Sequence, residues 1–479
     1  MSRVLFVVMG VTMARPMYVV VLIAFITANA LPEMVPMTKG GLRMVLPALA
    51  VYLAGSVAIG SLRSALSLRA AGSGSDHAMR IAAARHGMLS MLTNAWLVGG
   101  LGGLVIFGYG HWVMVTLGLR NVPLAGRALL VTPFIVAMIL NWLLEYRFYR
   151  IAKTRMILQQ RLMGVDACGP WTIGEYLSYN LRHQFLFVAV PIAVILLIND
   201  SIELTSFSPT VKLIASTASA LTVIVIAPVM IVRVWRTAAM PVGELRDELV
   251  RVSQALKLRF RRLLVWRTGG MIANAMVMGI LWPVRYVLLS DALIQQLDER
   301  EVRAVFAHEA GHIVGHHLFY AMLFSVSSII VCSTAAEAAT WALGLDYWFA
   351  EVFAFSLLAP VWLLGFGYVS RRFERQSDVV AAWYCGEAGP SPEGRISPEG
   401  ACVFARSLER IAMLNGIGYG RFNWRHGSIR SRVEYVMWLG STGGTRAGAD
   451  RAVRRVKAML WVATLLSATI MAVRIQWDI

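Results

Sequence analysis

The chain has 479 residues, of which 57% are hydrophobic and 15% charged, and its mean hydropathy is +0.62. This composition excludes an ordinary soluble protein and indicates an integral membrane chain. A formal net charge of +18 would suggest a nucleic-acid partner in a soluble protein, but here the basic residues are assigned loop by loop, and we expect no nucleic acid.

Apolar segments recur along the chain, and several reach the roughly 20 residues with which a helix crosses a bilayer. We therefore predict a mainly α, polytopic helical membrane protein with about nine spans. The spans are expected near Met17–Leu31, Met44–Ser61, Leu89–Tyr109, Ala128–Leu144, Phe185–Ile198, Leu213–Val232, Leu318–Leu343, Trp348–Val369 and Met459–Val473.

The distribution of Lys and Arg predicts the orientation of these spans. Segments that follow even-numbered spans hold 37 of the 45 basic residues, whereas those that follow the first, third, fifth and seventh spans hold 3. Basic loops stay in the cytoplasm, so the even-numbered segments and the N-terminus are expected there. Forty of the 45 basic residues are Arg, which hints at a bacterial genome. The expected location is the bacterial inner membrane.

The segment after the sixth span is long enough for a small domain. Gly243–Lys257 has helical periodicity with mixed charge, and two β-rich runs within Arg267–Asp291 predict a hairpin or a pair of strands. Ser290 or Asp291 is expected to cap the next helix, and Asp298 begins another. A strand beside that helix is where an extended peptide could add by β-augmentation.

The helix that starts at Asp298 carries His308, Glu309 and His312 in the order H-E-x-x-H. Residues four apart share a helix face, so the two imidazoles can bind one metal ion. The spacing suits zinc, with a third protein ligand from elsewhere. Glu309 would then take a proton from the attacking water. The alternative is an interfacial helix with solvated histidines.

The histidines that follow this motif do not supply the third ligand. A metzincin would have its third His at position 318, which is Leu318. His317 misses that position by one residue, which on a helix is a rotation of about 100°. His316 lies beyond the ligand pair. The third ligand is therefore expected further along the chain.

After two more spans the chain returns to the same side of the membrane at S-R-R-F-E-R-Q-S-D, residues 370–378. Glu374 can supply the third ligand, and Asp378, one helical turn later, can orient a ligating histidine. Alternatively, Glu374 merely pairs with Arg371 or Arg375 on a solvated helix.

Three regions follow from this layout. An N-terminal transmembrane region is expected at residues 1–232, a metallopeptidase domain at 233–456 that two spans interrupt at about 318–369, and a C-terminal span at 457–479. The cysteines have no metal-type spacing and are expected to be free thiols. They are Cys168, Cys332, Cys385 and Cys402.

Five pieces of the chain together resemble the membrane metalloendopeptidase family of the heat-shock protease HtpX and the CAAX prenyl endopeptidases, which are gluzincins. They are A-N-A at 273–275, V-L-L-S-D-A-L at 287–293, A-V-F-A-H-E-A-G-H-I-V-G-H at 304–316, S-R-R-F-E-R-Q-S-D at 370–378 and W-R-H-G-S-I-R-S-R at 424–432. The resemblance implies a zincin-type domain with one Zn²⁺ per chain on His308, His312 and Glu374, and Glu309 as general base.

The same resemblance assigns roles to three further residues. His426 and Arg432 match positions that stabilise the tetrahedral oxyanion, and Asn274 matches a substrate-strand position. The family commonly has Pro where this chain has Gly427. Alternatively, His426 is a surface loop histidine and Arg432 contacts a phosphate or a lipid headgroup.

The chain is therefore expected to be a membrane-embedded zinc endopeptidase. Its expected partners are the lipid bilayer and a peptide or membrane-protein substrate, and no oligomeric state is predicted. The alternative is a catalytically silent, zinc-binding membrane scaffold or chaperone. A transporter would need charged or broken spans in two matching halves, which the sequence lacks.

Overall fold

The computed structural model describes residues 17–34, 38–39, 41–71, 76–162, 169–346, 348–386 and 389–477. The chain divides into two compact units. The first comprises Met1–Ala238, Trp266–Ile272 and Leu414–Gly418, and the second comprises Ala239–Val265, Ala273–Met413 and Tyr419–Ile479.

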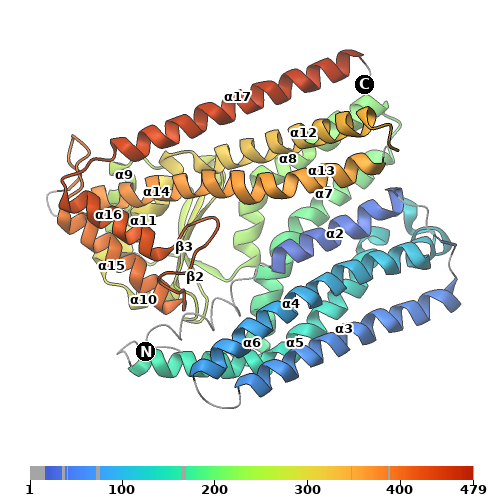
Figure 1. Ribbon diagram of the computed structural model, residues 1–479, viewed down its shortest axis with the longest axis horizontal. Helices are drawn as coiled ribbons and strands as arrows, with labels where there is room; N and C mark the ends of the chain where they lie inside the picture. The colour runs from blue at the N-terminus through green and yellow to red at the C-terminus, as the bar shows by residue number, and fades with distance from the viewer. Residues whose placement is uncertain are drawn as a thin grey trace. The chain divides into compact units, whose positions relative to one another are not determined.

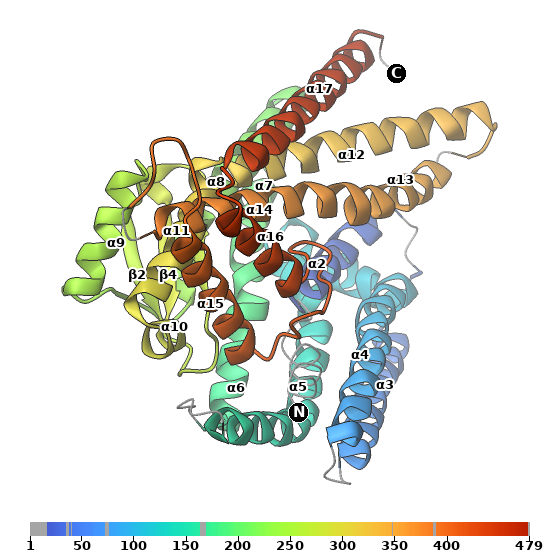
Figure 2. The same ribbon diagram turned by 60° about the vertical axis from the view of Figure 1, so that its left-hand side comes forward.

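The first unit is built from long apolar helices, of which α3 and α4 lie side by side (Figures 1 and 2). Its helices are α2 (Met17–Met34), α3 (Leu42–Ala71), α4 (Asp76–Leu104), α5 (Ala125–Leu162), α6 (Ile173–Asn180), α7 (Phe187–Glu203) and α8 (Pro209–Val234), with π-helical or 3₁₀ pieces η1 (Val105–Tyr109), η2 (Trp112–Thr116), η3 (Leu119–Asn121) and η4 (Leu181–Leu186).

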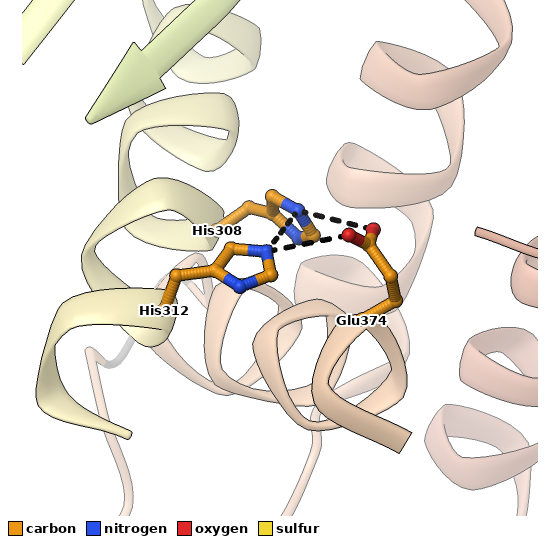
Figure 3. A group of neighbouring side chains, drawn as sticks. All are labelled: His308, His312 and Glu374. Carbon is orange, nitrogen blue, oxygen red and sulfur yellow. Dashed lines mark hydrogen bonds and ion pairs between the residues drawn. The ribbon is translucent and has the colours of Figure 1, made fainter. Parts of the chain in front are cut away.

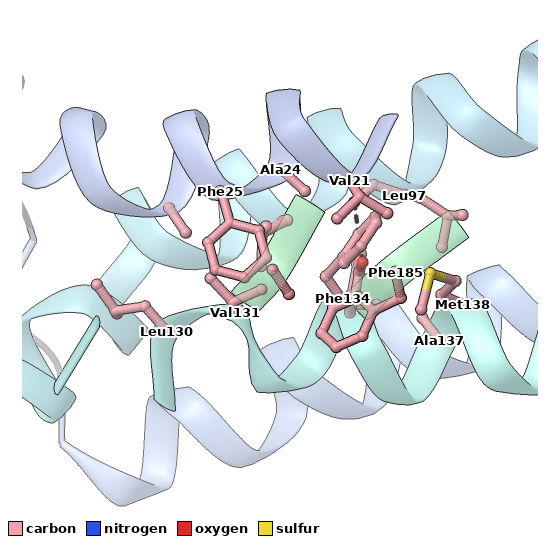
Figure 4. Packing of buried hydrophobic residues seen from close by; sticks show 14 of the residues in the cluster. Val21, Ala24, Phe25, Leu97, Leu130, Val131, Phe134, Ala137, Met138 and Phe185 are labelled. Carbon is pink, nitrogen blue, oxygen red and sulfur yellow. Dashed lines mark hydrogen bonds between the residues drawn. The ribbon is translucent and has the colours of Figure 1, made fainter. Parts of the chain in front are cut away.

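Close packing of apolar side chains holds these helices together, as van der Waals contact must do where lipid is the solvent. Phe134 and Leu97 are fully buried and pack with Phe25 and Phe185 (Figure 4). Glycines allow the close approach of α3 and α4. A Cβ atom on Gly100, for example, would lie 2.8 Å from the ring of Tyr52.

Six helices in the described residues are long and apolar enough to cross a membrane, and they coincide with the second to seventh predicted spans. They are Leu42–Ala71, Arg85–Tyr109, Ala125–Leu162, Ile173–Glu203, Pro209–Val234 and His317–Ala342. The first predicted span falls on α2, where the apolar run Val19–Asn29 is shorter. The chain is thus an integral membrane protein.

The second unit combines helices with most of a small four-stranded sheet, whose strand order is β1-β2-β4-β3. The strands are β1 (Thr237–Ala239), β2 (Arg262–Trp266), β3 (Ala275–Met278) and β4 (Tyr286–Ser290). The helices are α9 (Glu244–Ala255), η5 (Trp282–Val284), α10 (Asp291–Gln296), α11 (Glu299–Val314), α12 (His317–Ala342), α13 (Trp348–Pro360), η6 (Val361–Phe366), α14 (Gly367–Tyr384), α15 (Pro398–Leu414), α16 (Ile429–Ser441) and α17 (Ala447–Trp477).

The predicted hairpin is confirmed. Strands β3 and β4 pair antiparallel, with Ala275 opposite Leu289 and Met278 opposite Tyr286. Every residue of β4 is buried, as expected of an inner strand, whereas β3 lies at the edge of the sheet. Strand β2, which pairs with β4 on its other side, was not anticipated from the sequence.

The eighth and ninth predicted spans also fall on helices of this unit. The eighth corresponds to α13 and η6, which continue directly into α14, and η6 is a six-residue π-helix that follows Pro360. Proline lacks the N–H that would continue the α-helical ladder, and π-helical turns are one way in which a helix adjusts to such a break. The ninth lies within α17.

The expectation of free thiols is confirmed for the three cysteines in the described residues. Cys332 and Cys385 are buried and Cys402 is exposed, and each is free. The fourth, Cys168, lies outside the described residues.

Candidate metal centre

Helix α11 begins where the sequence predicts, because its first turn is capped on both sides. The Asp298 side chain accepts a hydrogen bond from the backbone N–H of Glu301 (2.8 Å), and the Glu301 side chain accepts one from the backbone N–H of Asp298 (3.1 Å). Such a capping box satisfies two N–H groups that have no partner within the helix. With its start fixed, α11 presents His308 and His312 one turn apart on the same face.

Helix α14 brings Glu374 and Asp378 to that face, because the two helices approach closely at a glycine. A Cβ atom on Gly311 would lie only 3.0 Å from the Cα of Ser377, so a larger residue there would push the helices apart. Arg371 and Arg375 do not pair with Glu374 here. Arg371 donates to the backbone carbonyl of Trp424 (2.5 Å), and the Arg375 guanidinium lies over the ring of Tyr435.

His308, His312 and Glu374 point their polar atoms toward one another (Figure 3). The two Nε2 atoms are 3.3 Å apart. Glu374 Oε2 lies 3.7 Å from His308 Nε2, and Glu374 Oε1 lies 3.6 Å from His312 Nε2. The three side chains thus form a group that could hold one metal ion.

The spacing of these atoms fits tetrahedral zinc. Bonds of roughly 2.0–2.2 Å at tetrahedral angles place neighbouring ligand atoms roughly 3.3–3.5 Å apart. The observed separations of 3.3, 3.6 and 3.7 Å are close to these values. Two imidazoles and one carboxylate also form a ligand set of catalytic zinc sites, which keep their fourth position for water or substrate.

Asp378 and Arg432 hold the outer side of this group. His308 Nδ1 lies 3.0 Å from Asp378 Oδ1, and Arg432 donates to both Asp378 oxygens, from Nε (2.8 Å) and from Nη2 (2.5 Å). Arg432 Nη2 is also 3.4 Å from Glu374 Oε2. A carboxylate on the far nitrogen of a ligating histidine fixes both the tautomer and the ring orientation.

These contacts outweigh burial in setting the charge of three groups. Burial by itself raises the pKa of Glu374 and of Asp378. The Arg432 guanidinium and hydrogen bonds from histidines have the opposite effect and prevail, so the pKa of Asp378 is lowered and that of Glu374 lies well below its usual range. Burial lowers the pKa of His308, but its contact with Asp378 reverses this and the pKa is raised. The two carboxylates are therefore ionised at neutral pH.

For His312 and Glu309, burial determines the direction in which the pKa shifts. Burial lowers the pKa of His312 to about 4, so its ring is neutral, as a metal ligand must be. Burial raises the pKa of Glu309 to about 7 in the metal-free protein, where the negative Glu374 adds to the effect. A carboxyl that titrates near neutral pH is suited to accept and return a proton.

His426 reaches the centre from a loop that precedes α16. Its Nδ1 lies 2.8 Å from Glu374 Oε1, and 42% of the side chain is exposed. The Asn423 side chain shapes this loop by accepting hydrogen bonds from the backbone N–H groups of Arg425 and His426. Gly427 adopts a φ of +80°, which proline cannot reach, so a proline at that position would not fit this loop.

Asn274 lies apart from the ligand group, immediately before the edge strand β3. Its side chain is exposed, its backbone N–H donates to Ser290 Oγ (2.9 Å), and its carbonyl accepts from the Ser290 N–H (2.9 Å). Strand β3 also packs against α11.

Sequence reasoning missed one set of residues around His312. His317, Gln376 and Asp450 form a series of close contacts that starts at His312 Nδ1. The spacing of His317 excludes it as the third ligand of a metzincin, and no local motif connects positions 317, 376 and 450.

Comparisons with known proteins found similarity to a family and to a solved structure. Residues 241–399 match Peptidase family M48, a range that contains His308, Glu309, His312 and Glu374. Among solved structures, the crystal structure of S. mikatae Ste24p is similar, with a TM-score of 0.48 and 15% sequence identity over 83% of this chain and 100% of that chain. No curated protein matches the chain.

Proposed function

We propose that this membrane protein is a zinc endopeptidase for membrane-associated or membrane-protein substrates, because residues 241–399 match Peptidase family M48, a family of zinc metallopeptidases. The observation that carries the proposal is the convergence of His308 Nε2, His312 Nε2 and the Glu374 carboxylate within 4.8 Å of one another. We assign one Zn²⁺ per chain to these three side chains.

The metal, when bound, polarises the scissile carbonyl and makes water a stronger nucleophile at neutral pH. In the proposed reaction, the Glu309 carboxylate takes one proton from the attacking water as the oxygen bonds to the carbonyl carbon. Glu309 then delivers that proton to the amine nitrogen as the C–N bond breaks. It is free for this work because it is not one of the three proposed ligands.

We propose different roles for His426 and Arg432. The proposed role of His426, whose ring is 42% exposed, is to donate a hydrogen bond to the oxyanion that forms on the carbonyl. The Arg432 guanidinium is largely engaged by Asp378 and Glu374, and its side chain is 13% exposed. Its contribution is therefore mainly to hold the two carboxylates in place.

A substrate would add to the sheet at β3. This strand lies at the edge of the sheet, packs against α11 and follows the exposed Asn274. An extended peptide can pair with such an edge through its own backbone, which selects conformation more than sequence. That mode suits a peptidase whose substrates are loosely folded protein segments.

The test compares the parent with Glu309→Gln at equal zinc content. Proton transfer by a positioned side chain contributes about 10²–10⁴-fold to rate, so cleavage of a loosely folded membrane substrate should fall by that factor while zinc stays bound. Equal cleavage rates would exclude Glu309 as the base. If neither protein cleaves any substrate but both preserve cellular function, the scaffold alternative is favoured instead.

We also propose that the centre faces the cytoplasm of a bacterial cell, because the segments around it hold most of the basic residues. In a background with all four cysteines replaced by Ser, Pro390→Cys should react with a membrane-impermeant thiol reagent only after the cells are opened. Thr205→Cys should react in intact cells. Reaction of the cysteine introduced at position 205 only from inside would reverse the proposed orientation.

A further inference from the structure

A break between α11 and α12 folds the next part of the chain back against His312. Helix α11 ends at Val314 with Gly315 as its C-cap, and His316 adopts a φ of +53°, a conformation that is uncommon for residues other than glycine. A Cβ atom on Gly315 would collide with His317 Nε2. The glycine and the left-handed residue together allow the buried His317 ring to lie against His312.

His317 is held in this place from two sides. Its ring stacks on Phe373 of α14, with centroids 4.2 Å apart and an interplanar angle of 2°. Its Nδ1 lies 3.0 Å from His312 Nδ1, and its Nε2 lies 2.8 Å from Gln376 Oε1. The ring therefore connects the metal ligand to an amide on the opposite helix.

The connection continues to α17. Gln376 Nε2 donates to Asp450 Oδ1 (2.6 Å), and Asp450 Oδ2 accepts from Arg446 Nε (3.0 Å). All four links lie within the second unit. They join the first turn of α17 to a proposed zinc ligand on α11.

The carboxylate at the end of this series sets the direction of every hydrogen bond in it. Asp450 can only accept, so Gln376 must turn its NH₂ group toward Asp450 and its oxygen toward His317. His317 must then carry its proton on Nε2 and accept at Nδ1. His312 must in turn donate from Nδ1, which leaves the lone pair of its Nε2 directed toward His308 and Glu374.

We propose that Asp450, Gln376 and His317 are positioning residues that fix the tautomer and orientation of His312 for metal binding. The proposal rests on the proposed role of His312 as a zinc ligand. Groups that hold the far nitrogen of a ligating histidine typically contribute about 10- to 100-fold to metal affinity. Here the carboxylate acts through an amide and a second imidazole.

The test is Asp450→Asn, which reverses the direction of the series. Arg446 can only donate, so the oxygen of the introduced amide must face Arg446 and its NH₂ group must face Gln376. Gln376 must then turn its own NH₂ toward His317, and the series ends with the proton on His312 Nε2, where the metal should bind. Zinc affinity, measured by chelator competition, is expected to fall about 10- to 100-fold.

The double variant Gln376→Glu with Asp450→Asn restores the original direction. A glutamate at position 376 accepts both from the amide at position 450 and from His317 Nε2, so zinc affinity is expected to recover most of the about 10- to 100-fold loss of the single variant. The matched control is Glu434→Gln, an exposed carboxyl on α16, which should bind zinc as the parent does.

The melting temperature of the metal-free proteins shows whether the variants remain folded. A folded Asp450→Asn protein that binds zinc as tightly as the parent would overturn the proposal. A double variant that binds zinc as weakly as Asp450→Asn would also overturn it, because the loss of affinity would then come from altered packing and not from the direction of the hydrogen bonds. If the parent itself binds no zinc, the proposed function fails instead, which is a different result.

Discussion

Within the described residues, each compact unit holds a largely buried cluster of Arg, His and carboxylate, and the two clusters differ in which of their polar atoms have partners. In the first unit, Glu145 lies 2.8 Å from His86 Nε2 and 3.4 Å from Arg63 Nη2, and His86 Nδ1 lies 3.1 Å from Ser67 Oγ. Both nitrogens of the imidazole and both oxygens of the carboxylate therefore have a hydrogen-bonding or charged partner.

In the second unit the outer nitrogens of His308 and His312 have partners, but their inner Nε2 atoms face each other and Glu374. His308 Nδ1 lies 3.0 Å from Asp378 Oδ1, and His312 Nδ1 lies 3.0 Å from His317 Nδ1. The two Nε2 atoms and the Glu374 carboxylate converge as three potential ligand atoms. Burial and residue type therefore do not distinguish an ion-pair network from a group that could hold a metal ion, whereas the arrangement of the polar atoms does.

The largest difference between the clusters should appear in zinc stoichiometry. Glu374→Gln removes the anionic ligand and should empty the site, because two neutral imidazoles remain. Glu145→Gln is the matched change in the other cluster and should leave one zinc per chain. Metal analysis of the purified proteins measures both. Full occupancy in Glu374→Gln would contradict the proposed ligand set.

The next effect is on stability and should be confined to the first cluster. Arg63→Ala leaves the partly buried Glu145, whose side chain is 18% exposed, with His86 as its remaining partner, which is expected to lower the free energy of unfolding by less than the roughly 3–5 kcal/mol of a fully buried pair, without changing zinc content. Replacing both residues by Leu should recover most of the loss, because no buried charge then remains. A double variant less stable than Arg63→Ala would show that the pair itself is stabilising.

A smaller effect is expected where Asp378 supports His308. Asp378→Asn should weaken zinc binding by about 10- to 100-fold, because an amide satisfies His308 Nδ1–H less well and cannot bind Arg432 through two oxygens. The control is Asp247→Asn on the exposed face of α9, and chelator competition measures both. An unchanged affinity in Asp378→Asn would mean that packing alone orients His308.

The smallest effect concerns Glu309 in the metal-free protein, where burial raises its pKa from an ordinary value of 4.5 to about 7. A carboxyl with a raised pKa stabilises the fold below about pH 4.5, and that contribution is lost as the pH rises through about 7. Glu309→Gln should therefore be more stable than the parent at pH 8, by about 1–3 kcal/mol, and no more stable at pH 4. Melting curves in a chelator test this, and equal stability at pH 8 would show that the carboxylate is solvated.

The sequence was sufficient to predict features that depend only on residues close together in the chain. The i, i+4 histidines, the capping residues Asp298 and Ser290 and the hairpin at 275–290 follow from local rules, and the structure has them where expected. The predicted boundaries of the domains, at residues 232 and 456, remain predictions.

The features that could not be predicted depend on contacts between residues that are far apart in the sequence. The direction of the hydrogen bonds behind His312 requires residues 317, 376 and 450 to be neighbours, which only the packing of α12, α14 and α17 brings about. Likewise, Arg432 was expected at the oxyanion from resemblance, and its bidentate contact with Asp378 appears only when α16 and α14 are in place. Strand β2 is five residues long and carries no turn signal that would have identified it.

The π-helix η6 preserves the rotational position of the helix that supplies Glu374. Each residue in an α-helix turns the chain by about 100°, whereas a π-helical turn takes in one residue more than an α-helical one and so turns the chain less per residue. The six residues Val361–Phe366 therefore rotate the chain about as far as an α-helical stretch one residue shorter. Removing one residue from η6 restores α-helical geometry and is expected to leave Glu374 facing His308, whereas the same deletion in the α-helical part of α14 before Glu374 would turn that side chain by about 100°.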